Sequence, residues 1–316
     1  MARRRQDELR ALHDADGVRT SSMRFEMALQ SPTKRVSTRC QRRLARVCLG
    51  VCLLTLPALL VALAVSFRSG EDGDGYREAA VSSEHYLATR AGIQVLRNGG
   101  NAFDAAAVIQ LVLGVVQPQS TGLGGGCMAL LYKASDGSVV ALDGREEAPA
   151  SFGEAAFCKT AACNESWPFF PDRVTGGHPV GVPGVLAAVA RVLNEFGTLT
   201  LAQALQPAIE VATEGFPMYD HLHSRILANR DRLALFNASA ALYLSPDASS
   251  PRVPVGATFT NPDLAATMRA IATGGTAAFY EGPIGDDLRA AVAAAANPAT
   301  GLAGNLSAAD LAGDRA

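Results

Sequence analysis

One arginine stands where it could bind a substrate. Arg145 directly follows a predicted strand over residues 139–142, and strand ends that face a cleft are common positions for recognition residues. Its planar guanidinium group can bind a carboxylate through two parallel hydrogen bonds. The neighbouring Glu146 and Glu147 leave a second interpretation open, in which Arg145 forms an ion pair on the surface. Arg145 is the candidate residue for binding an anionic group.

Two other motifs are better explained by a structural role than by binding of a phosphate or a metal. The glycine-rich run 122–126 follows a predicted helix and precedes a predicted strand, whereas phosphate-binding glycine loops follow a strand and open a helix. We interpret this run as a tight turn or a close packing of backbone.

His221 and His223 would share one face of a strand, but their segment is typical of a helix or an irregular region, and no further ligand is nearby. Surface histidines are therefore favoured over a zinc site.

The remaining sequence offers no evident catalytic nucleophile. Neither the GxSxG nor the HExxH pattern occurs, so no serine triad or zinc protease helix can be assigned. A CxxC pair is also absent, and we expect neither a metal nor a cofactor. The residues alone predict a mixed α and β domain without a visible nucleophile.

Helical and strand patterns surround Arg145. A predicted hairpin of strands 127–132 and 139–142 places Arg145 at its end. The helix predicted over 102–116 is apolar nearly all round, which is typical of a helix at the centre of a fold, and Asn101 and Asp104 suit its start. Further helices are predicted over 82–97, from 181–184 to about 196, from Thr200 to Gly215, from Asn261 to about 274–275, over 284–296 and from Ser307 onward. Alanine-rich helices around short apolar strands predict an α/β (α+β) fold.

Composition is that of a protein with a sizeable core. The chain has 316 residues, of which 48% are hydrophobic and 18% charged, and this balance argues against a disordered or fibrous protein. The formal net charge is -2, so no overall field favours nucleic acid as a partner.

A membrane anchor is predicted over residues 47–67. The segment begins at Val47, ends at Phe67 and contains 21 residues without a charge, and a bilayer core of about 30 Å needs roughly 20 apolar residues in a helix. Arginines crowd the preceding flank and acidic residues follow, which predicts a single-pass type II protein with its N-terminus in the cytoplasm. The alternatives are a cleaved signal peptide, for which the segment is long, and a buried core helix.

The anchor divides the chain into four parts. Residues 1–46 are expected to be a disordered basic cytoplasmic tail, 68–78 a linker, and 79–316 an extracellular or lumenal domain, with the plasma membrane as the expected location. Asn164, Asn237 and Asn305 begin N-x-S sequons, the acceptors of N-glycosylation in an exported domain. Cys158 and Cys163 are candidates for a short-loop disulfide there. Cys127 lies in an apolar run and is interpreted as a buried free thiol.

The domain after the linker resembles the γ-glutamyltransferases, also called γ-glutamyl transpeptidases or glutathione hydrolases. The resemblance covers about 79–313. Its specific motifs are GGNAFDAA at 99–106, GLGGG at 122–126, REEAP at 145–149 and VPG at 182–184, and its weaker ones are EGFP at 214–217 and AFYEG at 278–282. They occur in the order and with the spacing of that family.

The resemblance implies a fold and a reaction. It implies an Ntn-hydrolase αββα four-layer sandwich built from a large and a small subunit of one precursor. The nucleophile would be the N-terminal threonine of the small subunit, whose amine serves as base. That threonine would form an acyl-enzyme with the γ-glutamyl group of glutathione or its conjugates, and water or an acceptor amino acid or dipeptide would then take the group. Arg145 would bind the α-carboxylate of the substrate.

The sequence departs from the family at its C-terminal end. It stops at Ala316, before the expected threonine, the glycine pair of the oxyanion hole and the acidic group for the substrate amine. We therefore expect a large-subunit-like domain that is inactive alone, with incomplete sheets and exposed strand edges. The alternative from another class is a non-catalytic membrane glycoprotein, a pseudoenzyme or fragment derived from the family. A related acylase is a third hypothesis, but its substrate would not need the cation of Arg145.

Overall fold

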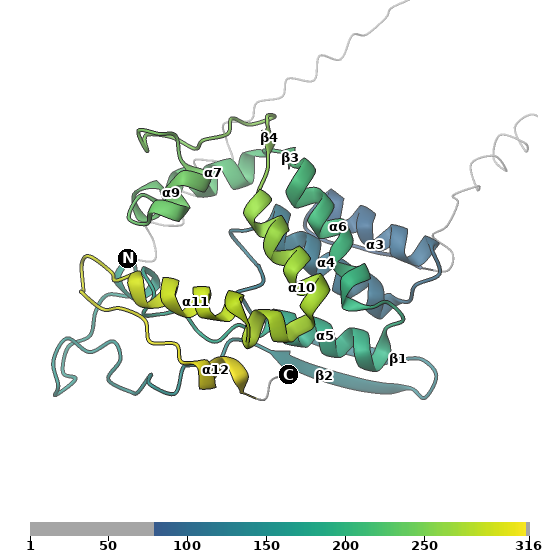
Figure 1. Ribbon diagram of the computed structural model, residues 1–316, viewed down its shortest axis with the longest axis horizontal. Coiled ribbons are helices and arrows are strands. Elements are labelled where there is room, and N and C mark those ends of the chain that lie inside the picture. The colour runs from purple at the N-terminus through teal and green to yellow at the C-terminus, as the bar shows by residue number, and fades with distance from the viewer. Residues whose placement is uncertain (1–78, 314–316) are drawn as a thin grey trace, which may run out of the picture. The chain divides into compact units, whose positions relative to one another are not determined.

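Helix α4 (Ala102–Val116) lies at the centre of residues 79–313, the part of the chain that the computed structural model describes (Figure 1). Its buried side chains, among them Val108, Leu111 and Val115, lie on one half of the helix. Ile109 and Leu113 on the other half are partly buried. Helices α3 (Tyr86–Arg97), α5 (Val185–Phe196) and α6 (Leu201–Glu214) all contact it. The prediction of a central, apolar helix with these bounds is confirmed.

The start of α4 is closed by a capping box. The side chain of Asn101 accepts hydrogen bonds from the amides of Phe103 and Asp104 at 2.8 and 2.9 Å, and Asp104 accepts from the amide of Asn101 at 2.9 Å. Such reciprocal bonds satisfy amides that have no partner within the helix. The predicted capping role of both residues is confirmed.

Strands β1 (Cys127–Lys133) and β2 (Ser138–Gly144) form the predicted hairpin, slightly longer than the sequence pattern indicated. They pair in antiparallel register with Leu131 opposite Val140. One face buries Leu131 and Leu142 against Ala188 and Val192 of α5, because successive side chains of a strand point to opposite faces. The hairpin therefore packs on α5 through one face.

A second small sheet follows α6. Gly215 ends α6 as predicted and adopts φ 87°, which favours glycine. The chain then forms β3 (Phe216–Pro217), which pairs with β4 (Thr258–Phe259) in antiparallel register. Between these strands lie three helices, α7 (Asp220–Ala228), α8 (Arg230–Leu233) and α9 (Asn237–Tyr243).

The described residues from 262 on are mostly helical. Helix α10 (Pro262–Tyr280) is capped by Asn261 as predicted, and its first part ends near residue 275 as predicted. The chain breaks there at Gly275, with φ 68° and ψ -163°, and then resumes the helix. Helices α11 (Pro283–Ala294) and α12 (Ala308–Ala312) follow, and a short 3₁₀ helix (Asp172–Val174) precedes α5. Helix α12 starts after Ser307 as predicted, and Ser307 and Asp310 form a capping box there.

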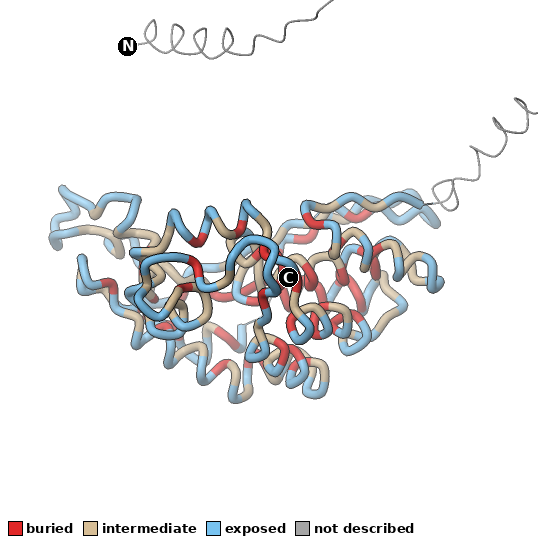
Figure 2. Tube along the Cα trace, turned by 90° about the horizontal axis from the view of Figure 1, so that it is seen from above, coloured by how far each residue is buried: buried red, intermediate tan, exposed pale blue. Residues whose placement is uncertain are grey.

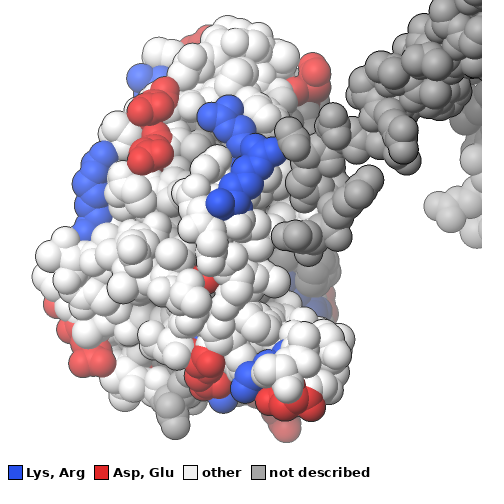
Figure 3. Space-filling view, turned by 90° about the vertical axis from the view of Figure 1, so that its right-hand side faces the viewer, with Lys and Arg blue, Asp and Glu red and all other residues white. Residues whose placement is uncertain are grey.

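The described residues form a mixed helix and sheet fold, as predicted. Their two sheets are two-stranded, and the extended sheets of a four-layer sandwich are not among residues 79–313. Figure 2 shows buried residues concentrated where the helices pack together. On the face drawn in Figure 3, basic and acidic side chains are interspersed and not gathered by sign.

The predicted tail, anchor and linker, residues 1–78, lie outside the described residues. Within residues 79–313, none of the helices is both long enough and apolar enough to cross a bilayer. The prediction of an anchor over 47–67 stays a prediction.

Candidate functional site

Arg145 follows the last residue of β2, as the sequence predicted. Its backbone amide donates a hydrogen bond of 3.0 Å to Oδ1 of Asp143. Its guanidinium Nη2 lies 2.9 Å from Oε2 of Glu146, and 58% of the Arg145 side chain is exposed. The ion pair suggested by the neighbouring glutamates is present, and much of the guanidinium group still faces solvent. Arg145 can therefore bind a carboxylate while it keeps Glu146.

Glu146 also belongs to the site, although the sequence indicated it only as a neighbour of Arg145. Its side chain is 28% exposed, and its Oε2 is buried without a hydrogen bond. A buried carboxylate oxygen is costly unless a charge compensates it, and the guanidinium group of Arg145 supplies that charge. Glu146 in turn restricts where Arg145 can lie.

The glycine run lies against the backbone of these two residues. A Cβ atom on Gly126 would lie 2.8 Å from Cα of Arg145 and 2.7 Å from the amide nitrogen of Glu146, and would collide with the Glu146 carboxylate. The carbonyl oxygen of Gly125 accepts hydrogen bonds of 3.0 Å from the amides of Gly184 and Val185. The prediction that these glycines allow close backbone packing is confirmed.

The segment 181–184 supports the same residues from another side. A Cβ on Gly184 would lie 2.8 Å from the carbonyl oxygen of Arg145. Val182 and Glu147 exchange backbone hydrogen bonds of 2.8 and 3.4 Å. The hydroxyl of Tyr280 donates to the carbonyl of Pro183 at 2.9 Å. The motifs at 122–126 and 182–184 thus meet the motif that holds Arg145, and Tyr280 of a fourth motif bonds to the second of them.

The C-terminal segment also contacts the loop after Arg145. The amide of Ala150 donates to Oδ1 of Asp310 at 2.8 Å, and the hydroxyl of Ser151 donates to the carbonyl of Asn305 at 2.9 Å. No sequence pattern indicated these contacts, because they join residues more than 150 positions apart. They fix the loop that carries the REEAP motif at its far end.

Cys127 lies beneath the site as a half-buried free thiol. Burial raises the pKa of this thiol, while the nearby positive charge of Arg145 opposes the rise. The thiol is therefore protonated near neutral pH and packs as an apolar group.

The other candidate residues lie away from Arg145 in the chain. The structure joins Cys158 and Cys163 in a disulfide with a Cα–Cα distance of 5.0 Å. The sequon residues Asn164, Asn237 and Asn305 are all exposed, so each is accessible, and their glycosylation stays a prediction. His221 and His223 lie on α7. Among residues 79–313, no group of three His, Cys, Asp or Glu side chains could hold a metal ion.

With this geometry established, comparison with known proteins identifies the class. The family model described as gamma-glutamyltranspeptidase matches residues 88–315. The chain is 34% identical over 244 residues to a glutathione hydrolase proenzyme of Bacillus subtilis, covering 73% of this chain and 40% of that protein. It is 35% identical over 211 residues to glutathione hydrolase 2 of Arabidopsis thaliana, covering 66% of this chain and 34% of that protein.

A solved structure supports the same family. The gamma-glutamyltranspeptidase of Helicobacter pylori superposes with a TM-score of 0.67 at 30% identity, over 74% of this chain and 63% of that one. The chain therefore belongs to the gamma-glutamyltranspeptidase family, a family of enzymes. It spans about two fifths or less of the length of these two curated relatives.

Proposed function

We propose that this chain is the large-subunit portion of a γ-glutamyltransferase that cleaves the γ-glutamyl amide of glutathione and its conjugates. The observation that carries this proposal is the packing of Gly126 and Gly184, from two other family motifs, against the backbone of Arg145, whose side chain remains 58% exposed. The glutamyl end of glutathione presents a free α-carboxylate, and a fixed guanidinium fork matches that group in charge and geometry.

In this proposal Arg145 orients the substrate and the small subunit supplies the chemistry. Arg145 binds the α-carboxylate, and the ion pair with Glu146 limits its movement, so that the γ-amide is presented in one place. An N-terminal threonine of the small subunit attacks the γ-carbonyl, and its amine accepts the hydroxyl proton. The leaving amine takes this proton as the C–N bond breaks, and water or an acceptor amino acid or peptide then takes the glutamyl group from the acyl-enzyme.

The exposed face of the hairpin supports assembly with further strands. Met128, Leu130 and Tyr132 alternate along β1 with exposed fractions of 74%, 76% and 63%. The opposite face of the same strands is buried on α5. Contiguous apolar side chains on a sheet face are typical of a surface that another element covers. We propose that the small subunit of the same precursor covers it and completes the four-layer αββα sandwich.

Leu130→Glu tests this assembly. In the chain expressed together with its small-subunit sequence, the charge should prevent the two parts from eluting as one complex. Lys133→Glu, at the exposed end of the same strand, is the matched control and should leave the complex intact. Co-elution of the Leu130→Glu protein would contradict the proposed interface.

The proposed protein is anchored by residues 47–67 as a single-pass type II protein, with its domain outside the cytosol at the plasma membrane. The support is the sequence pattern, a segment of 21 uncharged residues with a basic flank on its N-terminal side. Glutathione hydrolysis on that side would not consume the cytosolic pool.

One experiment tests the activity. The transcript should be read past Ala316, and the protein including any small-subunit sequence should be assayed with a chromogenic γ-glutamyl anilide. Release of the aniline supports the proposal. Correct folding without release would favour the alternative, a non-catalytic membrane glycoprotein.

A matched substrate separates the proposed enzyme from a related acylase. The 4-aminobutyryl anilide differs from the γ-glutamyl anilide only by loss of the α-carboxylate. We expect at least tenfold lower kcat/KM with it, because a charge-assisted hydrogen bond pair is lost. Equal cleavage of the two anilides would contradict the role of Arg145 in substrate choice.

A further inference from the structure

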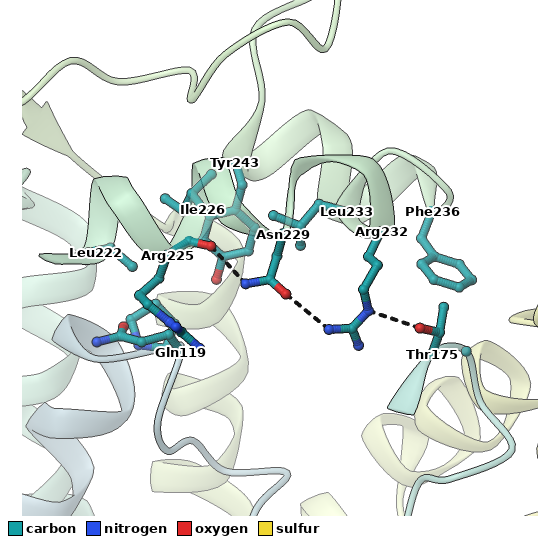
Figure 4. Close-up of a pocket in the computed structure, with 12 residues that line it drawn as sticks. Gln119, Thr175, Leu222, Arg225, Ile226, Asn229, Arg232, Leu233, Phe236 and Tyr243 are labelled. Atoms are coloured by element: carbon teal, nitrogen blue, oxygen red, sulfur yellow. Dashed lines mark hydrogen bonds between the residues drawn. The ribbon is translucent and has the colours of Figure 1, made fainter. Parts of the chain in front are cut away.

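A cavity of about 340 Å³ lies beneath helices α7, α8 and α9 (Figure 4). Residues 118–119 and 175–176 close it from the other side. Arg145 is not among its lining residues. Its volume lies within the range of about 300–1,000 Å³ that is typical of pockets for small organic molecules.

The charges that line this cavity are of one sign. Arg225 and Arg232 line it, and no Asp or Glu does. Its wall also includes apolar and aromatic side chains: Leu222, Ile226, Leu233, Phe236 and Tyr243. A pocket that combines guanidinium groups with an apolar wall suits an anion that carries an apolar body.

Arg232 is held in place by neutral groups. Its Nε donates to Oγ1 of Thr175 at 2.9 Å, its Nη1 donates to Oδ1 of Asn229 at 3.0 Å, and its Nη2 donates to the carbonyl of Val174. These partners fix the side chain without neutralising its charge. Burial lowers the pKa of Arg232, yet a guanidinium group stays protonated at any physiological pH. A fixed positive charge therefore borders the cavity.

Arg225 supplies a second charge on the other side of Asn229. Figure 4 shows its side chain extending from α7 toward Gln119, on the cavity side of the helix. Asn229 links the two arginines, because its Nδ2 donates to the backbone carbonyl of Arg225 at 2.9 Å while its Oδ1 accepts from Arg232.

Gln119 adds a buried acceptor atom that receives no hydrogen bond. Its Nε2 donates to Oε1 of Gln117 and to the hydroxyl of Tyr219, both at 3.3 Å. Its Oε1 is buried and has no hydrogen-bond partner. Buried polar atoms are rarely left without a partner in folded proteins, so a donor group on a ligand would complete this arrangement.

We propose that this cavity binds the C-terminal residue of a short peptide or an N-acylated amino acid with an apolar side chain. The carboxylate lies between Arg225 and Arg232, the side chain packs on the apolar wall, and the amide N–H donates to Oε1 of Gln119. The proposal concerns binding only and involves no reaction. It stands independently of the proposed transferase activity.

The probe for the test is N-acetyl-L-phenylalanine, which carries all three groups. Its binding to the full chain should be measured by isothermal titration calorimetry, with N-acetyl-L-phenylalaninamide as the neutral analogue. We expect saturable one-to-one binding of the acid and at least tenfold weaker binding of the amide, because a charge-assisted hydrogen bond is lost. Equal binding of acid and amide would overturn the proposal.

Variants locate the site. Arg225→Gln should weaken binding roughly tenfold, and because this side chain is exposed the variant should retain its melting temperature. Phe236→Ala should weaken binding through loss of apolar contact. The control is Arg191→Gln on α5, where an exposed arginine pairs with Glu195 at 2.7 Å. Affinity unchanged in Arg225→Gln, or equally reduced in Arg191→Gln, would overturn the assignment, as would competition by inorganic phosphate at the same concentration.

Discussion

The carboxylate of Asp104 accepts two hydrogen bonds from Thr198, one from the backbone amide at 2.7 Å and one from the hydroxyl at 2.8 Å. It also accepts from the amide of Leu199 at 3.0 Å and from that of Asn101 at 2.9 Å. Asp104 is completely buried. One carboxylate therefore joins the start of the central helix α4 to the loop between α5 and α6.

Replacing Asp104 by Asn should destabilise the fold by about 1–3 kcal/mol, because an amide cannot accept all of these bonds and brings donors of its own. Urea unfolding at neutral pH measures the change. The control is Asp263→Asn, an exposed residue in the first turn of α10, which should change stability by less than about 0.5 kcal/mol.

The same side chain predicts a pH dependence. Desolvation acts to raise the pKa of Asp104, but the hydrogen bonds from Asn101, Leu199 and Thr198 outweigh it and hold the pKa below its usual value of 3.8. Because the folded-state pKa is the lower one, the stabilisation is present above about pH 4 and is lost as pH falls through the folded-state value. The difference between wild type and Asp104→Asn should shrink in that range. A difference that stays constant between pH 3 and 7 would contradict this account.

Substitution by alanine should destabilise the protein at Gly126 but not at the nearby Gly124. At Gly126 a Cβ would meet backbone atoms of Arg145 and Glu146 at 2.8 and 2.7 Å, whereas at Gly124 nothing lies within 4 Å. Gly126→Ala should cost about 1–3 kcal/mol through overpacking and should abolish substrate binding, because the Arg145 backbone must move. Gly124→Ala should be close to neutral. Thermal unfolding of the two variants decides, and equal melting temperatures would show that the packing at Gly126 is not tight.

Local features of this fold could be predicted from the sequence. The bounds of α4, its cap at Asn101, the capping box at Thr200 and the hairpin before Arg145 all depend on residues within a few positions of one another. Side-chain periodicity and capping chemistry act over that distance. The position of Arg145 at a strand end was predictable for the same reason.

Other features depend on contacts between distant segments and carry no local signal. The close approach of Gly126 to Glu146 and the bond from Ala150 to Asp310 could not be predicted from spacing. The helical turn that follows the break at Gly275 buries Phe279 and Tyr280 in the core, and the glycine pair alone does not indicate that turn. The short helices α8 and α9 have no apolar period long enough to reveal them.

The exposed sequons predict glycosylation if the domain lies outside the cytosol. Asn164, Asn237 and Asn305 are each exposed, so all three can be reached by a glycan. In cells, treatment with peptide-N-glycosidase should shift the protein to lower mass, and each Asn→Gln variant should remove one step of that shift. Asn261 is followed by Pro262, so Asn261→Gln is a control that should leave the mass shift unchanged. Absence of any shift would contradict the predicted orientation of the anchor at 47–67.

Arg145→Lys tests substrate binding in the protein that includes the small-subunit sequence. Lysine keeps the positive charge but loses the planar fork, so it cannot bind a carboxylate through two parallel hydrogen bonds. We expect KM for the γ-glutamyl anilide to rise roughly tenfold or more, with a smaller change in kcat. Arg191→Lys on the exposed face of α5 should leave both constants unchanged.

A second substrate separates a binding role of Arg145 from a structural one. The 4-aminobutyryl anilide has no α-carboxylate, so its kcat/KM should be nearly the same for wild type and Arg145→Lys. If the variant instead lost activity equally on both anilides, Arg145 would act by holding Glu146 and the surrounding loop. An unchanged KM for the γ-glutamyl anilide would contradict both roles, because the exposed guanidinium group would then contribute neither to binding nor to the arrangement of the site.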